Sequence, residues 1–97
     1  MNTIEKVSEI TYSDIAEYIR VPDDEQNTLE NMLTIAKAFI KSYTGLNDEQ
    51  VDEHADFVIV VFILCQDMWD NRTLYVDNNN LNKVVETILG MHSVNLL

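Results

Sequence analysis

An uninterrupted apolar run from Phe57 to Cys65 constrains the fold of this chain more than any other feature. The run is rich in β-branched residues and on its own suits a buried strand. Its flanks favour a helix, because apolar residues continue at steps of three and four with no Gly or Pro between them. This stripe consists of Val51, Ala55, Val58, Phe62, Cys65 and Trp69. We therefore predict one long helix, capped by Asn47 and Asp48, that reaches about Asp70.

The middle of this helix is apolar all round, so it must be covered on more than one side. The covering surface is either the other helices of the chain or another subunit. Composition also favours helices, because 46% of the residues are hydrophobic and the chain has only two Gly and one Pro. Such a composition disfavours disordered and loop-rich folds.

A short helix is predicted near the amino terminus. Thr11 lies three residues before Asp14, in an arrangement similar to a capping box. The helix should end at Val21, because the residue before Pro22 avoids helical backbone angles. Its apolar stripe consists of Tyr12, Ile15, Ala16 and Ile19.

A second helix follows, and both of its ends are well marked. The acidic residues Asp23 to Glu25 suit the positive end of the helix dipole, and Lys37 and Lys41 occupy later turns, where cations are favourable. Gly45 lies where a left-handed carboxyl-terminal cap is expected. The apolar positions at helical spacing are Leu29, Met32, Leu33, Ala36, Phe39, Ile40 and Tyr43.

After the long helix, Asn71 to Asn80 predicts a loop with room for a short extended piece, ending in a helix cap. Gly90 either weakens or ends the last helix. The apolar stripe of that helix consists of Leu81, Val84, Val85, Ile88 and Leu89. The sequence therefore predicts an all-α fold: a small four-to-five-helix bundle with a loop before the last helix, forming a single domain over residues 1–97.

The charge and the cysteine count exclude several classes of function. Six Lys and Arg against seventeen Asp and Glu give a formal net charge of -11, which repels a phosphate backbone, so a DNA-binding role is not expected. The single cysteine cannot form an internal disulfide, and the amino terminus lacks the order of a secretory signal, so we expect a reducing, intracellular origin. The longest apolar run is far shorter than the roughly 20 residues that span a membrane as a helix, so we expect a soluble protein with no membrane partner.

The available residue types do not predict an enzyme. Only His54 and His92 offer imidazole bases, and solvated or capping roles fit both better than catalysis. Cys65 lies on the apolar stripe, which favours a buried hydrophobic role over a reactive thiol. One Cys and two distant His do not supply the roughly four ligands of a zinc site. We therefore expect no catalytic residues, no metal and no cofactor.

Two groups of polar side chains have structural interpretations. Asp67 and Asp70 share a helix face and could act as an acid and a base, but a solvated helix surface fits them better. Asp77 to Asn80 offers oxygen ligands but lacks the alternating spacing, central Gly and terminal Glu of a calcium loop. We interpret it as a turn.

The corner formed by Asp70, Asn71 and Arg72 is the most unusual local feature, because a long apolar helix ends there in charged and amide side chains. Trp69 and Tyr75 flank this corner. Two interpretations of Arg72 stay open. It either bonds the last carbonyls of its helix and ties down the loop, or it contacts another subunit.

With its order of helices, caps and corner, the chain resembles the family of small head-to-tail connector proteins of tailed bacteriophages, also called adaptor or head-completion proteins. The resemblance extends over nearly the whole chain and is moderately specific as an ordered set. The resemblance rests on four segments: the end of the opening helix, Glu17 to Val21; the acidic turn, Pro22 to Glu25; the end of the second helix, Ala36 to Gly45; and the end of the apolar helix, Asp70 to Arg72.

The resemblance implies a structural role: a homo-oligomeric ring, typically of twelve copies, that docks beneath the portal protein and extends the DNA channel. The ring would also bind the next neck or tail-completion protein, and DNA would pass through it without specific binding. The implied location is the virion neck, and the host cytoplasm during assembly. The resemblance further implies an interface with other subunits or the portal in the loop after the corner and in the last helix. We assign this interface to Asp70, Asn71, Arg72, Tyr75, Leu81 and His92.

Physical arguments fit this role, because closed rings use head-to-tail contacts and a helix that is apolar all round provides surface for them. Acidic side chains lining the channel would repel DNA and keep it from adhering. The alternative is a small acidic helical inhibitor, such as a DNA mimic or an immunity-type protein that masks a basic partner. The apolar excess of the long helix favours the ring, because a mimic needs ordered surface carboxylates instead.

Overall fold

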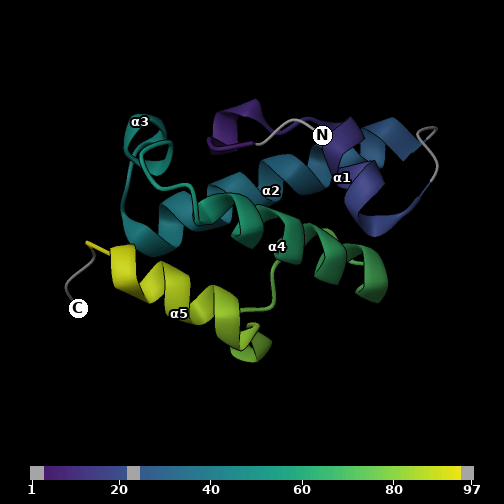
Figure 1. The fold of residues 1–97 in the computed structure, drawn as a ribbon. Coiled ribbons are helices and arrows are strands. Elements are labelled where there is room, and N and C mark those ends of the chain that lie inside the picture. The colour runs from purple at the N-terminus through teal and green to yellow at the C-terminus, as the bar shows by residue number, and fades with distance from the viewer. Residues whose placement is uncertain (1–3, 22–24, 95–97) are drawn as a thin grey trace.

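The computed structural model describes residues 4–21 and 25–94, and within these ranges the fold is all-α. The predicted fold class is thereby confirmed, including the loop before the last helix (Figure 1). The elements in chain order are the 3-10 helix η1 (Val7–Glu9), α1 (Tyr12–Ile19), α2 (Gln26–Thr44), α3 (Asp48–Val51), α4 (Phe57–Asn71), the 3-10 helix η3 (Asn78–Asn80) and α5 (Lys83–His92).

Helix α4 lies at the centre of the bundle and packs against α1, α2, α5 and η1. Its buried residues are Phe57, Val58, Val60, Val61, Leu64, Cys65 and Met68. The prediction that this helix is covered on more than one side is therefore confirmed. The buried face is rotated from the predicted stripe, because Phe62 and Trp69 are only half buried whereas Leu64 and Met68 are fully buried. Ile59 remains 40% exposed, which leaves part of the apolar helix uncovered by this chain.

The prediction of a single long helix from residue 47 to residue 70 is wrong, because a turn at residues 52–56 separates α3 from α4. Val51 and Phe57 are both buried on the two sides of this turn. On a continuous helix their side chains would point about 120° apart, so the turn lets both enter the core. The turn also places the Asp52 carboxylate where it accepts hydrogen bonds from the Ser8 N–H at 3.0 Å and the Ser8 hydroxyl at 2.6 Å.

Helix α1 begins as predicted. The Thr11 N–H donates to Asp14 Oδ2 at 2.8 Å, and the Asp14 N–H donates to Thr11 Oγ1 at 3.3 Å, which is a capping box. The helix ends at Ile19 and not at Val21, because Arg20 adopts the left-handed conformation with φ of 61°. The N–H of Val21 then donates to the Ala16 carbonyl at 3.1 Å, which closes the helix end.

Helix α2 ends as predicted, with Gly45 in the left-handed conformation at φ of 79°. Its last residue, Thr44, is buried, and the Thr44 carbonyl accepts a hydrogen bond from the Val94 N–H at 2.7 Å. This bond ties the segment after α5 to the end of α2. The predicted acidic turn falls partly outside the described residues, since Pro22, Asp23 and Asp24 are not among them.

Helix α5 begins later than predicted, and at its other end the structure decides between the two roles left open for Gly90. Its cap is Asn82 and not Asn80, because the Asn82 side chain accepts hydrogen bonds from the first amides of the helix. Gly90 lies inside α5, which continues to His92, so the glycine does not end the helix. The reason is tertiary packing: Val85 is fully buried and holds the helix in place, which outweighs the low helix propensity of one exposed glycine.

Candidate functional site

The corner at the end of α4 is closed by its own backbone. Arg72 adopts the left-handed conformation with φ of 57°, and its N–H donates to the Trp69 carbonyl at 3.3 Å. The N–H of Thr73 donates to the Met68 carbonyl at 3.0 Å. These bonds satisfy carbonyls that a helix end leaves open. The Arg72 backbone therefore acts as the helix cap, and its guanidinium lies over the Trp69 ring, with the guanidinium carbon 5.3 Å from the ring centre.

The loop after the corner is shaped by side-chain hydrogen bonds. Asp77 accepts one from the Asn79 N–H at 3.1 Å and one from the Asn80 side chain at 2.8 Å. The Asn80 side-chain bond is the main cause of a lowered pKa for the exposed Asp77 carboxyl; desolvation acts in the opposite direction, and the backbone N–H groups of Asn79 and Asn80 lower the pKa further. The predicted turn is confirmed as the 3-10 helix η3, and these carboxylate oxygens are engaged in forming it.

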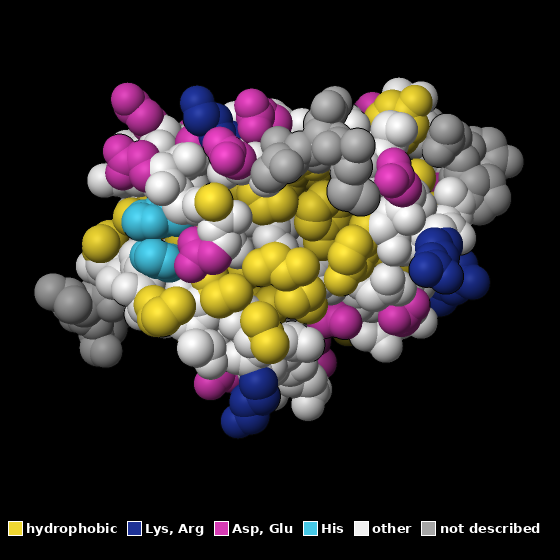
Figure 2. Space-filling view, viewed as in Figure 1, with side chains coloured by type: hydrophobic (Ala, Val, Ile, Leu, Met, Phe, Trp, Pro, Cys, Tyr) yellow, Lys and Arg dark blue, Asp and Glu magenta, His cyan; other side chains and the backbone are white. Residues whose placement is uncertain are grey.

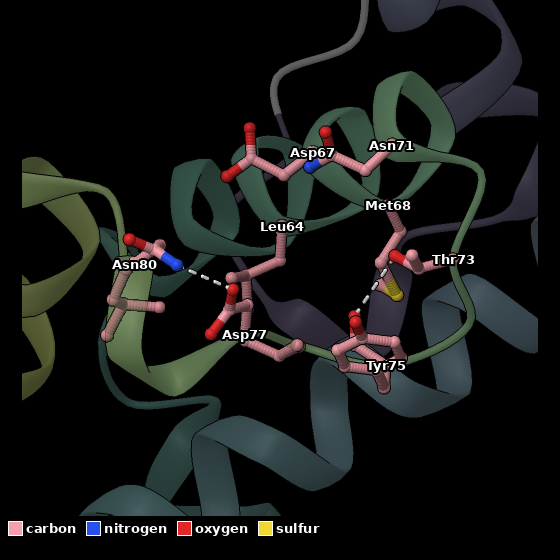
Figure 3. A pocket seen from close by; sticks show the side chains of 10 residues that line it. Leu64, Asp67, Met68, Asn71, Thr73, Tyr75, Asp77 and Asn80 are labelled. Carbon is pink, nitrogen blue, oxygen red and sulfur yellow. Dashed lines mark hydrogen bonds between the residues drawn. The ribbon is translucent and has the colours of Figure 1, made fainter.

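A pocket of about 320 Å³ lies between α4 and this loop. Figure 3 shows Leu64 and Met68 projecting from α4 toward the loop that carries Tyr75 and Asp77. The full lining consists of Leu64, Asp67, Met68, Asn71, Thr73, Tyr75, Val76, Asp77, Asn80 and Leu81. An apolar floor with carboxylate and amide groups around it can receive a side chain of mixed character, such as Lys, Arg or Tyr from a partner.

Asp67 also lines this pocket, and its pKa is shifted in the direction opposite to that of Asp77. Burial raises the pKa of its carboxyl, and the charge of the nearby Asp70 raises it further. Asp70 itself is exposed and accepts a hydrogen bond from the Gln66 side chain at 2.9 Å. Their expected position on a solvated helix surface therefore holds for Asp70, whereas Asp67 is partly desolvated.

A second pocket of about 320 Å³ lies on the other side of the corner and is formed by α2, the end of α4 and the loop. Its lining consists of Glu25, Thr28, Met32, Trp69, Arg72, Thr73 and Leu74. Thr73 belongs to both pockets, so the short segment after Arg72 divides them. Among the lining residues of the second pocket, Arg72 is the cationic one and Glu25 the acidic one.

The six residues assigned to an interface do not form one surface. Asn71, Tyr75 and Leu81 line the first pocket, and Arg72 lines the second. Asp70 lies on the adjacent exposed surface of α4. The sixth residue, His92, is the last residue of α5 and lies beside Asp56 at the amino-terminal end of α4, apart from the other five.

His92 belongs instead to a cluster that the sequence did not predict. Its Nε2 atom lies 2.9 Å from Asp56 Oδ2, and its ring centre lies 4.0 Å from that of His54. Figure 2 shows the two histidine rings beside each other at one end of the molecule. His92 occupies the last turn of α5, where a capping role is expected, but the sequence interpretation did not pair it with His54. The spacing of His54 and Asp56 offered only a weak signal, because their partner lies far along the chain.

Cys65 is buried in the core, as predicted, and burial raises the pKa of its thiol to about 12. The thiol is therefore protonated at neutral pH and is a poor nucleophile. Its surroundings are apolar side chains of the bundle core.

Together, the fold and the corner define a small acidic all-α bundle that presents two pockets beside the end of its central helix. No protein-family model matches the chain, and neither a curated protein nor a solved structure does. Among the described residues, every helix is too short or too polar to cross a membrane.

Proposed function

We propose that this chain is a structural subunit of a head-to-tail connector ring of a tailed bacteriophage. The ring docks beneath the portal, extends the DNA channel and binds the next neck or tail-completion protein. Two arguments support the proposal: the resemblance of the sequence to this family, and one structural observation. The observation is that one apolar surface lies on the first half of α4 and a second lies in the loop beyond its carboxyl-terminal end.

The first apolar surface lies where α1 meets the beginning of α4. Tyr18 is 43% exposed and stacks on Phe62, with ring centres 4.9 Å apart, and Ile59 is exposed beside them on the same helix as Phe62. Figure 2 shows hydrophobic side chains gathered across the middle of this face, with charged groups toward its rim.

The second apolar surface lies in the loop after α4. Leu74 is 52% exposed and Tyr75 is 62% exposed, and the two follow each other directly beyond the corner. Ile59 and Arg72 are separated by a helical rise of about 20 Å, so the two surfaces are distinct. A head-to-tail contact joins two different surfaces of identical subunits, whereas a two-fold dimer uses one surface twice. Two distinct apolar surfaces therefore favour a ring.

The distribution of charge fits a channel wall. Among the described residues, Lys41 and Asp48 form the one ion pair that includes a lysine or an arginine, at 3.0 Å. Most carboxylates in the described part of the chain therefore have no lysine or arginine within ion-pair distance, and they can face a channel that DNA traverses without adhering.

Electron microscopy and native mass spectrometry of the untagged protein, alone and mixed with its portal protein, test the proposal. The expected result is a closed ring of defined copy number, alone or on the portal. A protein that stays monomeric in both samples would contradict the proposal. Tight binding of such a monomer to a basic nuclease would establish the alternative, an acidic inhibitor.

A further inference from the structure

We propose that His54, Asp56 and His92 form a binding site for one divalent transition-metal ion with the ligand preferences of Zn²⁺. The site lies at the amino-terminal end of α4, away from the corner at its carboxyl-terminal end. The inference therefore does not depend on the proposed connector role.

Two segments that are far apart in the chain bring the ligands together. His54 and Asp56 belong to the turn between α3 and α4, and His92 is the last residue of α5. One ligand atom from each of the three residues lies within 4.8 Å of the others. Tetrahedral zinc has ligand bonds of about 2.0–2.1 Å and hence ligand atoms about 3.3 Å apart, so the cluster needs only side-chain rotation to close around an ion.

The cluster rests on a buried wall and has an open side. The fully buried Phe57 ring meets both imidazoles edge-on, with ring centres 5.3 Å from His54 and 5.1 Å from His92. The Asp56 side chain is 39% exposed and that of His92 is 23% exposed. The wall fixes the rings, while the open side admits an ion and leaves a position for a water ligand, as in zinc sites with three protein ligands.

The ligand atoms select the metal class. Two imidazole nitrogens and one carboxylate oxygen suit zinc and neighbouring transition metals, whereas Mg²⁺ and Ca²⁺ prefer oxygen ligands throughout. In the absence of metal, Asp56 and His92 share one hydrogen bond, and a bound ion would replace the shared proton. The two histidines are distant in the chain but adjacent in the fold, so they can supply two ligands to one ion.

Isothermal titration calorimetry of the untagged, chelator-treated protein with ZnCl₂ tests the site, with CoCl₂ absorption as a probe of coordination. We expect one ion per chain. The variants His54→Gln, Asp56→Asn and His92→Gln should each weaken binding at least about tenfold, since losing even an outer partner of a metal ligand commonly costs 10–100-fold. The control Asp67→Asn removes a carboxylate from the other end of α4 and should leave the affinity unchanged.

Thermal unfolding gives a second readout, because an ion that binds only the folded chain raises its melting temperature. Zn²⁺ should raise the melting temperature of the unaltered protein and of Asp67→Asn but not of the three site variants. Asp56→Asn changes a partly exposed side chain, so it remains informative if a histidine variant unfolds. The proposal is overturned if no zinc binds at micromolar concentration, if the site variants bind as tightly as the control, or if Mg²⁺ competes equally, since the net charge alone attracts cations.

Discussion

The guanidinium of Arg72 stacks on the ring of Trp69, 5.3 Å from its centre, although the Arg72 backbone is left-handed. The two features act on stability in opposite directions. A left-handed backbone costs a residue with a side chain roughly 1 kcal/mol or more, whereas an exposed cation–π contact stabilises by about 0.5–1 kcal/mol. Arg20 has the same backbone conformation at the end of α1 but makes no cation–π contact among the described residues.

This difference predicts unequal effects of two identical substitutions. Arg20→Gly should raise the free energy of unfolding by roughly 0.5–1 kcal/mol, because glycine adopts the left-handed conformation without strain. Arg72→Gly should raise the free energy of unfolding by less, because it also removes the contact with Trp69. Urea unfolding of both variants measures the difference. Equal stabilisation by the two substitutions would mean that the stack contributes nothing.

The packing of α5 predicts a contrast between two neighbouring residues. Leu89 is fully buried, whereas Met91 is 65% exposed. Leu89→Ala should lower the free energy of unfolding by about 2–5 kcal/mol, because it leaves a cavity in the core, and Met91→Ala should change it by less than about 0.5 kcal/mol. Guanidinium unfolding checks both. A small effect of Leu89→Ala would show that α5 is not held to the bundle by this side chain.

The raised pKa of Asp67 predicts that Asp67→Asn, which removes the charge, increases the free energy of unfolding by an amount that depends on pH. Burial, and secondarily the charge of Asp70, raises the pKa above its usual 3.8, so ionised Asp67 destabilises the folded state above that pKa. The cost disappears as the pH falls through the raised pKa toward 3.8. Asp67→Asn should therefore stabilise by about 0.2–0.5 kcal/mol at pH 7, the magnitude for a like-charge pair on a helix.

The measurement is the melting temperature of both proteins at pH 7 and at pH 3.5. Asp67→Asn should have the higher melting temperature at pH 7, and the two proteins should not differ at pH 3.5. A gain of equal size at both pH values would indicate an effect on packing instead of charge.

The proposed ring predicts that Arg72→Ala weakens assembly more than folding. The side chain borders the second pocket and Leu74, whereas the cap is made by the backbone, which alanine retains. The fraction of protein in rings, measured by sedimentation velocity, should fall while the free energy of unfolding changes by about 1 kcal/mol or less. Arg20→Ala is the matched control, since it makes the same change at another left-handed helix end. Unchanged rings together with a large loss of stability would show that Arg72 serves only its own helix.

The helix ends that the sequence predicted correctly are those with local determinants. Thr11 and Asp14 cap α1 through bonds to each other, and Gly45 closes α2 through its own backbone conformation. The turn at residues 52–56 has no such local signal, because its residues all tolerate a helix. It lets Val51 and Phe57 both enter the core and brings Asp52 to Ser8, 44 positions away, contacts that no local pattern reveals.

In the candidate sites, too, the sequence relates residues that are close in the chain but not residues that only the fold brings together. Asn71, Tyr75 and Leu81 line one pocket because they are close in the chain, at the corner that the sequence analysis singled out as an interface. The placement of His92 depends on how α5 folds back along α4, so its contact with Asp56 could not be read from spacing. Sequence periodicity assigns faces to helices but does not determine which helix ends meet.

The hydrogen bond from the Val94 N–H to the Thr44 carbonyl makes one amide a reporter of a specific motion. The Val94 side chain is exposed, yet its amide proton can exchange with deuterium only when the segment after α5 separates from the end of α2. Its exchange rate would therefore time the detachment of the last helix from the bundle, separately from fraying within that helix. The exchange rate of a single backbone proton thus measures how often one edge of the fold opens.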